Sequence, residues 1–488
     1  MDFLKTIWMF FQTNILTQPA FFVGFLVLIG SILLKKSWYQ CYASFVKATV
    51  GYLILNVGSG GLVSTFRPIL AGLNQRFNLN AAVIDPYFGQ NAAQQALEAA
   101  GRTSSLLFLG LLVAFFVNIL LVALNKVTKV RTLFTTGHIM MQQSATGIWM
   151  IIYFFPQLQD AAAVTMLGII LGIFWAVSSN LTVECTQRLT DGGGFAVGHQ
   201  QMFGIWLVDK ISPKIGGKDG KSIEELELPG WLSIFTDNVV ATSTLMLLFF
   251  GVLLTVLGPT FLKTPVADGG LGISFNSFPF YVMTTAFNMA VYLSILQLGV
   301  RMFVAELTES FTGISEKLLP GSVPAVDCAA TYGFGSPNAP IVGFFFGALG
   351  QFLAIIGLVI FKSPVLIITG FVPVFFDNAT FAVFANKASG LKAAIVTTFC
   401  SGIIQVLGGA VCAYAFGTYQ YGGWHGNFDM DTVWLAGGML QKYLGIIGYI
   451  ICVIALLVIP QLQYRADPEH YFQVVEDWDG YKAAKGIE

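Results

Sequence analysis

The sequence predicts an all-α polytopic membrane protein, with about ten to eleven transmembrane helices plus two re-entrant hairpins. Three observations lead to this fold class. Hydrophobic residues make up 55% of the 488-residue chain and charged residues only 10%, whereas soluble domains carry roughly 25% charge. The mean hydropathy is +0.72. Stretches long enough for a membrane helix recur along the chain, and glycine-rich polar segments interrupt them.

The same composition excludes several classes of protein. A net charge of −1 offers no basic surface, so no nucleic-acid partner is expected. The six cysteines lack CxxC spacing, which argues against a disulfide framework or a zinc site. Residues 216–222 resemble the end of a P-loop, but Ile215 stands where its first glycine belongs, so no ATP site is predicted. Nothing resembles a catalytic triad, and we expect neither catalytic residues nor a cofactor.

Ten largely uncharged stretches reach or approach the length of a membrane helix. In chain order they are residues 6–34, 37–57, 103–125, 132–159, 161–183, 239–262, 271–300, 328–361, 393–428 and 443–464. Two pieces, 192–208 and 363–384, are shortened or broken by charged residues, glycine or proline, and they predict the re-entrant hairpins. Residues 62–102 are too charged to span comfortably, so we place them within protein or at the interface.

The polar segments give the expected orientation in a lipid bilayer. The apolar run at the N-terminus is too long for a signal peptide and is expected to stay as the first span. The loop 209–227 carries both signs of charge and should face solvent. Its lysines and those of 126–131 mark cytoplasmic connectors by the positive-inside rule. A single membrane domain, residues 1–460, is followed by a polar, acidic cytoplasmic tail, 461–488.

Two internal matches suggest a duplicated chain. Residues 229–238 align with 369–378, and Gly, Phe, Asp and Asn recur in place. A weaker match, which needs a gap, joins 66–85 to 311–327. Chance agreement is the alternative for either match. A duplication would give pseudo-repeats over about 51–258 and 296–417, a pattern typical of transporters with a site near the membrane midplane. The paired Asp and Asn residues are expected to cap helices.

Two clusters of histidine and glutamine are the candidate binding site. The first, TGHIMMQQ, contains His138 and Gln142, which share one helix face because they lie four residues apart. The second, GGGFAVGHQQ, contains His199 and Gln200 just after a run of glycines. Donors and acceptors at membrane depth suit a hydroxyl-rich solute. The alternative is that these side chains only form hydrogen bonds between helices.

Two further residues have open alternatives. Asp327 begins a long uncharged run, and it either binds substrate or pairs with Arg301 or Lys317. Tyr87 either contacts a ligand or marks the membrane interface. Two histidines without an HxxxH pattern or a cysteine partner make a poor metal site, so no metal is predicted.

Seven motifs carry a family resemblance. They are GSGGLVSTFRP (58–68), GHIMMQQ (137–143), TDGGGFAVGHQQ (190–201), LPGWLSIFTDN (228–238), GVRMFVAELTE (299–309), DCAA (327–330) and FFDNAT (375–380). Together they resemble those of the ascorbate-specific IIC permease of the bacterial phosphotransferase system, over residues 1 to about 460.

This resemblance implies a multi-pass protein of the bacterial inner membrane that carries L-ascorbate. A separate cytosolic IIB protein, supplied with phosphate by IIA, would phosphorylate the cargo. The resemblance also implies a homodimer, with a core domain that moves against a V-shaped scaffold domain as an elevator. Carried over motif by motif, the substrate contacts would be Pro86, Tyr87, His138, Ile139, Met140, Met141, Gln142, His199, Gln200 and Asp327. Relatives are expected to have threonine at position 86, so a contact at Pro86 must come from the backbone.

Two other functions remain possible from the residues alone. The first is a proton-coupled secondary transporter for a sugar acid or pentitol, in which His138, His199 and Asp327 relay protons. The second is a membrane enzyme acting on a lipid-borne substrate, which the lack of a nucleophile and base pair disfavours.

Overall fold

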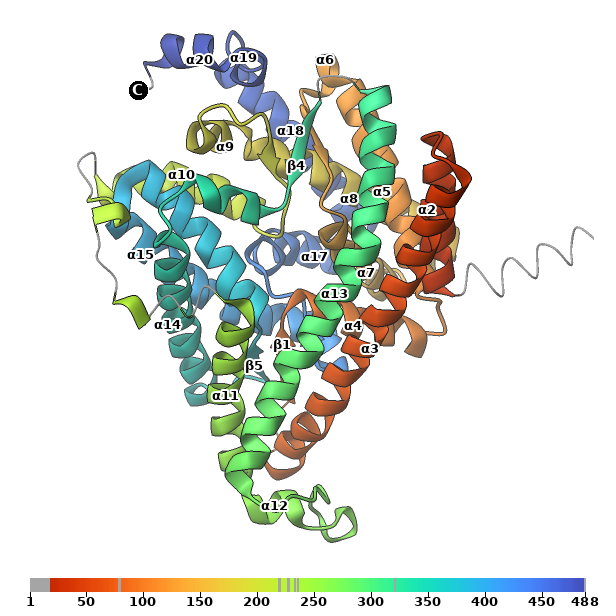
Figure 1. Ribbon diagram of the computed structural model, residues 1–488, viewed down its shortest axis with the longest axis vertical. Coiled ribbons are helices and arrows are strands. Elements are labelled where there is room, and N and C mark those ends of the chain that lie inside the picture. Colours follow the sequence, from red (N-terminus) through yellow and green to blue (C-terminus); the bar gives the residue numbers. More distant parts are fainter. Residues whose placement is uncertain are drawn as a thin grey trace, which may run out of the picture.

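Helices dominate the computed structural model, which describes residues 18–77, 80–217, 221–225, 229–231, 234, 237–319 and 322–486 (Figure 1). The α-helices are α2 (Pro19–Leu33), α3 (Trp38–Phe77), α4 (Pro86–Ala99), α5 (Ser105–Ala123), α6 (Asn125–Thr128), α7 (Gly137–Phe154), α8 (Asp160–Leu181), α9 (Val183–Thr190), α10 (Met202–Gly216), α11 (Asn238–Leu257), α12 (Pro259–Lys263), α13 (Phe278–Leu318), α14 (Ala339–Ile360), α15 (Asn378–Ala415), α16 (Phe428–Asp431), α17 (Val433–Leu444), α18 (Ile446–Ala466), α19 (Gln473–Glu476) and α20 (Trp478–Lys485).

Five helical segments in the described residues are long and apolar enough to cross a membrane. They are α5, α8, α14, α18, and α15 together with the π-helical turn Pro373–Asp377 that precedes it. Each overlaps a predicted span, and α2 and α11 contain shorter apolar stretches. The first span, 6–34, lies partly outside the described residues. The total of ten to eleven spans therefore stays a prediction.

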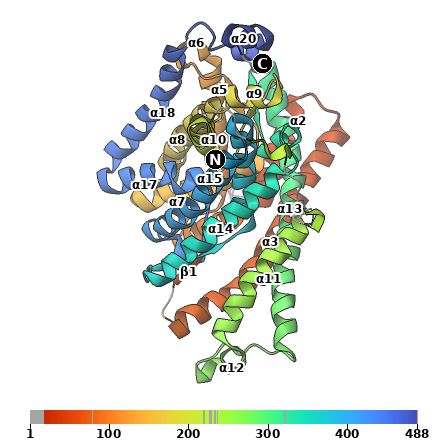
Figure 2. The same cartoon turned by 90° about the vertical axis from the view of Figure 1, so that its left-hand side faces the viewer.

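Two long helices, α3 and α13, lie side by side over 40 and 41 residues (Figures 1 and 2). With α11 they extend beyond the other helices and end near α12. Their backbones approach closely, because a Cβ atom on Gly299 would lie only 2.4 Å from the backbone nitrogen of Leu55. Such packing offsets the entropic cost of the glycines in α3. The helix continues through residues 62–77, which the sequence placed within protein or at the interface but not in a long helix.

In the described part of the chain, six short strands form two parallel sheets, which an all-α prediction did not include. The strands are β1 (Asn80–Ile84), β2 (Thr132–Phe134), β3 (Ala196–Val197), β4 (Val323–Val326), β5 (Val365–Thr369) and β6 (Gly423–Trp424). One sheet has the order β5-β1-β6 and the other β2-β4-β3. In each sheet the central strand comes from one half of the chain and the outer strands from the other half. Strands of two to five residues are too short to give a periodic pattern.

The two predicted hairpins each contain a strand followed by a helix. Residues 192–208 form β3 and the start of α10, and 363–384 form β5, the π-helical turn and the start of α15. Their re-entrant path stays a prediction. The predicted loop 209–227 begins later than expected, because α10 continues to Gly216 and buried Asp209 forms an ion pair with Arg188.

The aspartates of the internal matches behave differently from one another. Asp237 caps α11 as predicted, accepting hydrogen bonds from the backbone N–H groups of Val239 and Val240. Asp377 does not cap the following helix, because it lies in helical conformation itself. In the weaker match, Asp85 and Asp327 each follow a strand and cap the next helical segment.

The polar tail docks on the membrane domain rather than extending from it. The Arg131 guanidinium lies over the ring of Tyr471, 3.8 Å from its centroid, and donates to the Tyr471 carbonyl oxygen. At the other end, Lys482 lies 2.9 Å from a carboxylate oxygen of Asp191. Helices α19 and α20 therefore cover the end of the molecule beside α9 (Figures 1 and 2).

Candidate functional site

The ends of three parallel strands position the predicted site residues. His138 follows β2, His199 follows β3, and Asp327 comes directly after β4. These strands form one sheet, in which β4 pairs with both neighbours. Because the carboxyl ends of parallel strands meet at one edge of a sheet, residues almost 190 positions apart in the chain come together there.

At this edge the two histidines and the aspartate are in contact. His138 Nε2 lies 3.3 Å from Asp327 Oδ2, and the rings of His138 and His199 lie 6.2 Å apart between centroids. The other carboxylate oxygen of Asp327 accepts a hydrogen bond from the backbone N–H of Ala329 at 2.9 Å. The structure thus pairs Asp327 with His138, whereas the sequence proposed Arg301 or Lys317, whose side chains lie outside the described part of the chain.

Gln201 fixes the orientation of His199. Its side-chain oxygen lies 2.6 Å from His199 Nδ1 and also accepts from the backbone N–H of Gln200 at 2.9 Å. Its amide nitrogen donates to Thr380 Oγ1 and to the carbonyl oxygen of Phe376. Because a backbone N–H can only donate and a carbonyl can only accept, both ends of the Gln201 amide are assigned. Nδ1 of His199 therefore carries a proton, and Nε2 is the ring nitrogen left to contact a ligand.

A chain of buried amides adjoins the histidines. Gln200 donates to the side-chain oxygen of Gln142 at 2.9 Å and accepts from Gln143 at 2.7 Å. The chain ends at Trp175 of α8, whose indole N–H donates to the Gln143 oxygen at 2.7 Å. All four side chains are at most 1% exposed, so water does not replace these hydrogen bonds. The chain holds Gln142 and Gln200 in fixed positions.

The middle of the first cluster contributes packing. Ile139, Met140 and Met141 are buried in the main hydrophobic core. The first hydrogen bond of α7 runs from the Met140 N–H to the carbonyl of Thr136, so earlier N–H groups of this turn have no partner within the helix. A helix N-terminus of this kind favours a negatively charged ligand. Because the Ile139 side chain is buried in the core, a substrate contact at Ile139 would come from its backbone.

The segment with Pro86 and Tyr87 belongs to the other sheet. Asp85 ends β1 and accepts from the backbone N–H of Tyr87 at 3.0 Å, while Pro86 occupies the first turn of α4 without losing a hydrogen bond. Tyr87 packs against Phe371, which contacts Phe376, and the Phe376 ring lies 6.3 Å from that of His199. An aromatic cluster thus links the two sheet edges, one at Tyr87 and the other at His199.

Sequence reasoning missed the residues that hold this site in place. Gln143, Gln201 and Trp175 orient the predicted residues. The sequence placed both glutamines in the His-Gln clusters but did not predict them as substrate contacts, and it did not single out Trp175. The signal for the first two was the doubled glutamine that follows each histidine in the sequence. For Trp175, within an apolar span, the sequence offered no signal.

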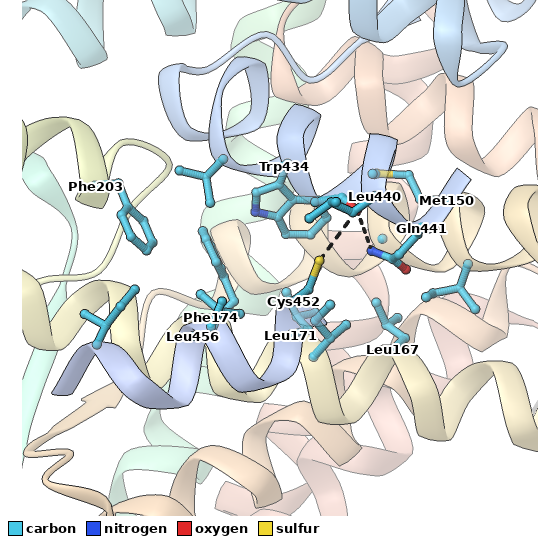
Figure 3. Close-up of a pocket in the computed structure, with 18 residues that line it drawn as sticks. Met150, Leu167, Leu171, Phe174, Phe203, Trp434, Leu440, Gln441, Cys452 and Leu456 are labelled. Atoms are coloured by element: carbon cyan, nitrogen blue, oxygen red, sulfur yellow. Dashed lines mark hydrogen bonds between the residues drawn. The ribbon is translucent and has the colours of Figure 1, made fainter. Parts of the chain in front are cut away.

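A separate apolar pocket lies between α7, α8, α17 and α18 (Figure 3). It has a volume of about 240 Å³, and Phe174, Trp434, Cys452 and Leu456 are among its lining residues. None of the predicted site residues lines it. Its almost wholly apolar wall suits hydrocarbon rather than a hydroxylated solute.

Comparison with known proteins identifies the family. A family model described as the PTS system sugar-specific permease component matches residues 14–432. The chain is also 34% identical over 432 residues to a protein of Mycoplasma pneumoniae (strain ATCC 29342 / M129 / Subtype 1) named "Ascorbate-specific PTS system EIIC component". The match covers 81% of this chain and 64% of that relative, so the chain spans less than two thirds of the relative's length. With its apolar helices, this membrane protein belongs to the family of PTS system sugar-specific permease components.

Proposed function

We propose that this protein carries L-ascorbate across the bacterial inner membrane, and that a separate IIB protein phosphorylates the ascorbate on the inside. The family supports a permease of the phosphotransferase system, and the name of the Mycoplasma relative supports ascorbate as cargo. The observation that carries the proposal is the buried amide chain beside His138, His199 and Asp327.

The chemistry of ascorbate fits these groups. At neutral pH ascorbate is a small anion with an enediol and a hydroxylated side chain. Amides of Gln142 and Gln200 can donate to and accept from its hydroxyl groups, and the N-terminus of α7 favours its negative charge. Two imidazoles add further hydrogen-bonding groups. Among the described residues, no lysine or arginine contacts this group of side chains, which suits a site that must release its cargo.

In this proposal the chain does no covalent chemistry and requires no cofactor. IIB, supplied by IIA, makes uptake irreversible by phosphorylating the cargo, and cytoplasmic segments such as 209–228 would dock IIB. We extend the proposal to a homodimer, in which a core domain moves against a V-shaped scaffold domain. The length of α3 and α13 supports a scaffold role for these two helices.

Internal duplication belongs to the same proposal. The arrangement of the sheets supports it, because β1 lies between β5 and β6 just as β4 lies between β2 and β3. Each central strand follows one of the two long helices. The second pseudo-repeat would then extend beyond residue 417, because it must include β6 at Gly423–Trp424.

Uptake of radiolabelled L-ascorbate tests the proposal. Cells that lack other ascorbate carriers would express this chain with or without its IIA and IIB partners. Phosphorylated ascorbate should accumulate only when the partners are present. If free ascorbate accumulates without the partners and an uncoupler abolishes this uptake, the proton-coupled carrier is favoured. If no ascorbate is taken up under either condition, ascorbate is not the cargo.

Two substitutions test the site itself. His199→Ala and Asp327→Ala should each abolish uptake while membrane abundance stays unchanged, because they remove polar groups from the proposed site. His470→Ala and Asp467→Asn provide matched controls, since both residues lie in the docked tail. Normal uptake by either site variant would remove that residue from the site.

A further inference from the structure

The group at the ends of β2, β3 and β4 has a chemistry beyond hydrogen bonding to a sugar acid. Each of its three side chains offers one ligand atom, and these atoms all lie within 4.8 Å of one another. Two imidazoles and one carboxylate form a set that holds Zn²⁺ in other proteins and leaves a position open for an outside ligand. We propose that His138, His199 and Asp327 form a binding site for a divalent transition metal ion, for which Zn²⁺ is the suitable probe.

The distances are close to those that zinc requires. Zinc bonds to imidazole nitrogen and carboxylate oxygen are about 2.1 Å long, so two ligand atoms on a tetrahedral ion lie about 3.4 Å apart. His138 Nε2 and Asp327 Oδ2 already have this spacing, at 3.3 Å. The widest of the three separations is at most 4.8 Å and must shorten by about 1.4 Å. Rotation of an imidazole side chain supplies a movement of this size.

The groups behind the ligands favour the metal-binding form of His199. Metal-bound histidines almost always donate their other ring N–H to an oxygen, which fixes the tautomer and the direction of the ring. Gln201 provides that oxygen at 2.6 Å from Nδ1, so Nε2 is the ring nitrogen left to contact a ligand. Asp327 is also fixed, because its Oδ1 accepts from the N–H of Ala329. These hydrogen bonds limit the orientations of His199 and Asp327 before an ion arrives.

The site is also open to an ion from solution. The side chains of His138 and Asp327 are 24% and 38% exposed, whereas His199 forms the buried base of the group. Metal and cargo would use the same three side chains. Zn²⁺ should therefore compete with ascorbate, a consequence that rests on the proposed function, whereas metal binding itself does not.

Isothermal titration of the purified full-length protein with Zn²⁺ tests the proposal. One ion should bind per chain, and His138→Ala and Asp327→Asn should each weaken binding at least 100-fold. Gln201→Leu should weaken it about 10- to 100-fold, as loss of such a supporting acceptor typically does. Gln201→Glu keeps an acceptor for Nδ1 and should restore binding. His470→Ala is the matched control, and it should bind Zn²⁺ as the unchanged protein does.

A second measurement avoids variants that fail to fold. Diethyl pyrocarbonate modifies accessible imidazoles, and mass spectrometry locates the modified sites in the unchanged protein. Zn²⁺ should protect His138 but not His470. Equal modification of His138 with and without Zn²⁺ would overturn the proposal. In the titration, the proposal would also fail if only His470→Ala abolished Zn²⁺ binding. If Zn²⁺ binds at this site but no ascorbate is taken up, the metal site stands and the proposed cargo fails.

Discussion

Substitution of Gln143 by methionine should both destabilise the protein and weaken substrate binding. Methionine preserves the length of the side chain but removes both polar atoms of the amide. The indole N–H of Trp175 and the side-chain oxygen of Gln200 would then lose the hydrogen bonds that each forms with Gln143 at 2.7 Å. Both groups are fully buried, so no solvent replaces the missing partner.

The expected cost follows from these two lost partners. A buried polar group without a hydrogen bond costs about 1–3 kcal/mol, so Gln143→Met should lower the free energy of unfolding by roughly 2–6 kcal/mol. Ascorbate affinity should fall at least about tenfold, which corresponds to about 1.4 kcal/mol, because Gln200 is no longer held toward the site. The control Gln461→Met removes one exposed hydrogen bond and should change stability by less than about 0.5 kcal/mol.

A double-mutant cycle with Trp175→Phe makes the reasoning testable. In the phenylalanine background there is no indole N–H to leave unpaired, so Gln143→Met should cost about 1–3 kcal/mol less than in the unchanged protein. Thermal unfolding in detergent and equilibrium binding of labelled ascorbate measure both effects. If the stability losses of the two single variants add within about 0.5 kcal/mol, or if Gln143→Met leaves ascorbate affinity unchanged, the hydrogen-bonded chain from Trp175 to the site is refuted.

Two further predictions concern the second site segment and the tail. Gly198→Ala would place a Cβ atom 2.7 Å from the carbonyl oxygen of Ala325, so β3 must move away from β4, at a cost of about 1–3 kcal/mol; unchanged thermal stability would contradict this. Burial alone would raise the pKa of Asp467, but hydrogen bonds from Lys485 and His470 outweigh it and hold that pKa below its ordinary value of 3.8. The ion pair between Lys485 and Asp467, which joins α20 to the end of α18, should therefore weaken only as the pH falls below about 4, measured by the anisotropy of a dye at the C-terminus; Lys485→Met should weaken this dependence.

Much of the helical fold was predictable from the sequence, because lipid requires long uncharged segments. The stretches 103–125 and 161–183 match α5 and α8 closely. The same reasoning missed α3 beyond residue 62, since the close packing of α3 against α13 is not visible in a local pattern. It also missed all six strands, because two to five buried residues carry too little periodicity.

The candidate site was predictable as a list of residues but not as an arrangement. His199 is directly followed by two glutamines, and His138 lies four residues before another such pair. These clusters were recognisable because polar groups of this kind are rare in membrane segments. The alternatives for Asp327 remained open because its partner depends on which strands pair. Pairing of β4 with β2 and β3 places Asp327 beside His138, a partner that the sequence had not named, and substrate binding by Asp327 stays a prediction.

The sequence by itself predicted a membrane protein and picked out the two His-Gln clusters, because composition and local spacing suffice for both. The tertiary structure alone decided that His138, His199 and Asp327 meet, and how the glutamines of the two clusters bond to one another. The physical reason is that parallel strands bring distant residues to one sheet edge, where a fixed network of hydrogen bonds assigns each amide its direction.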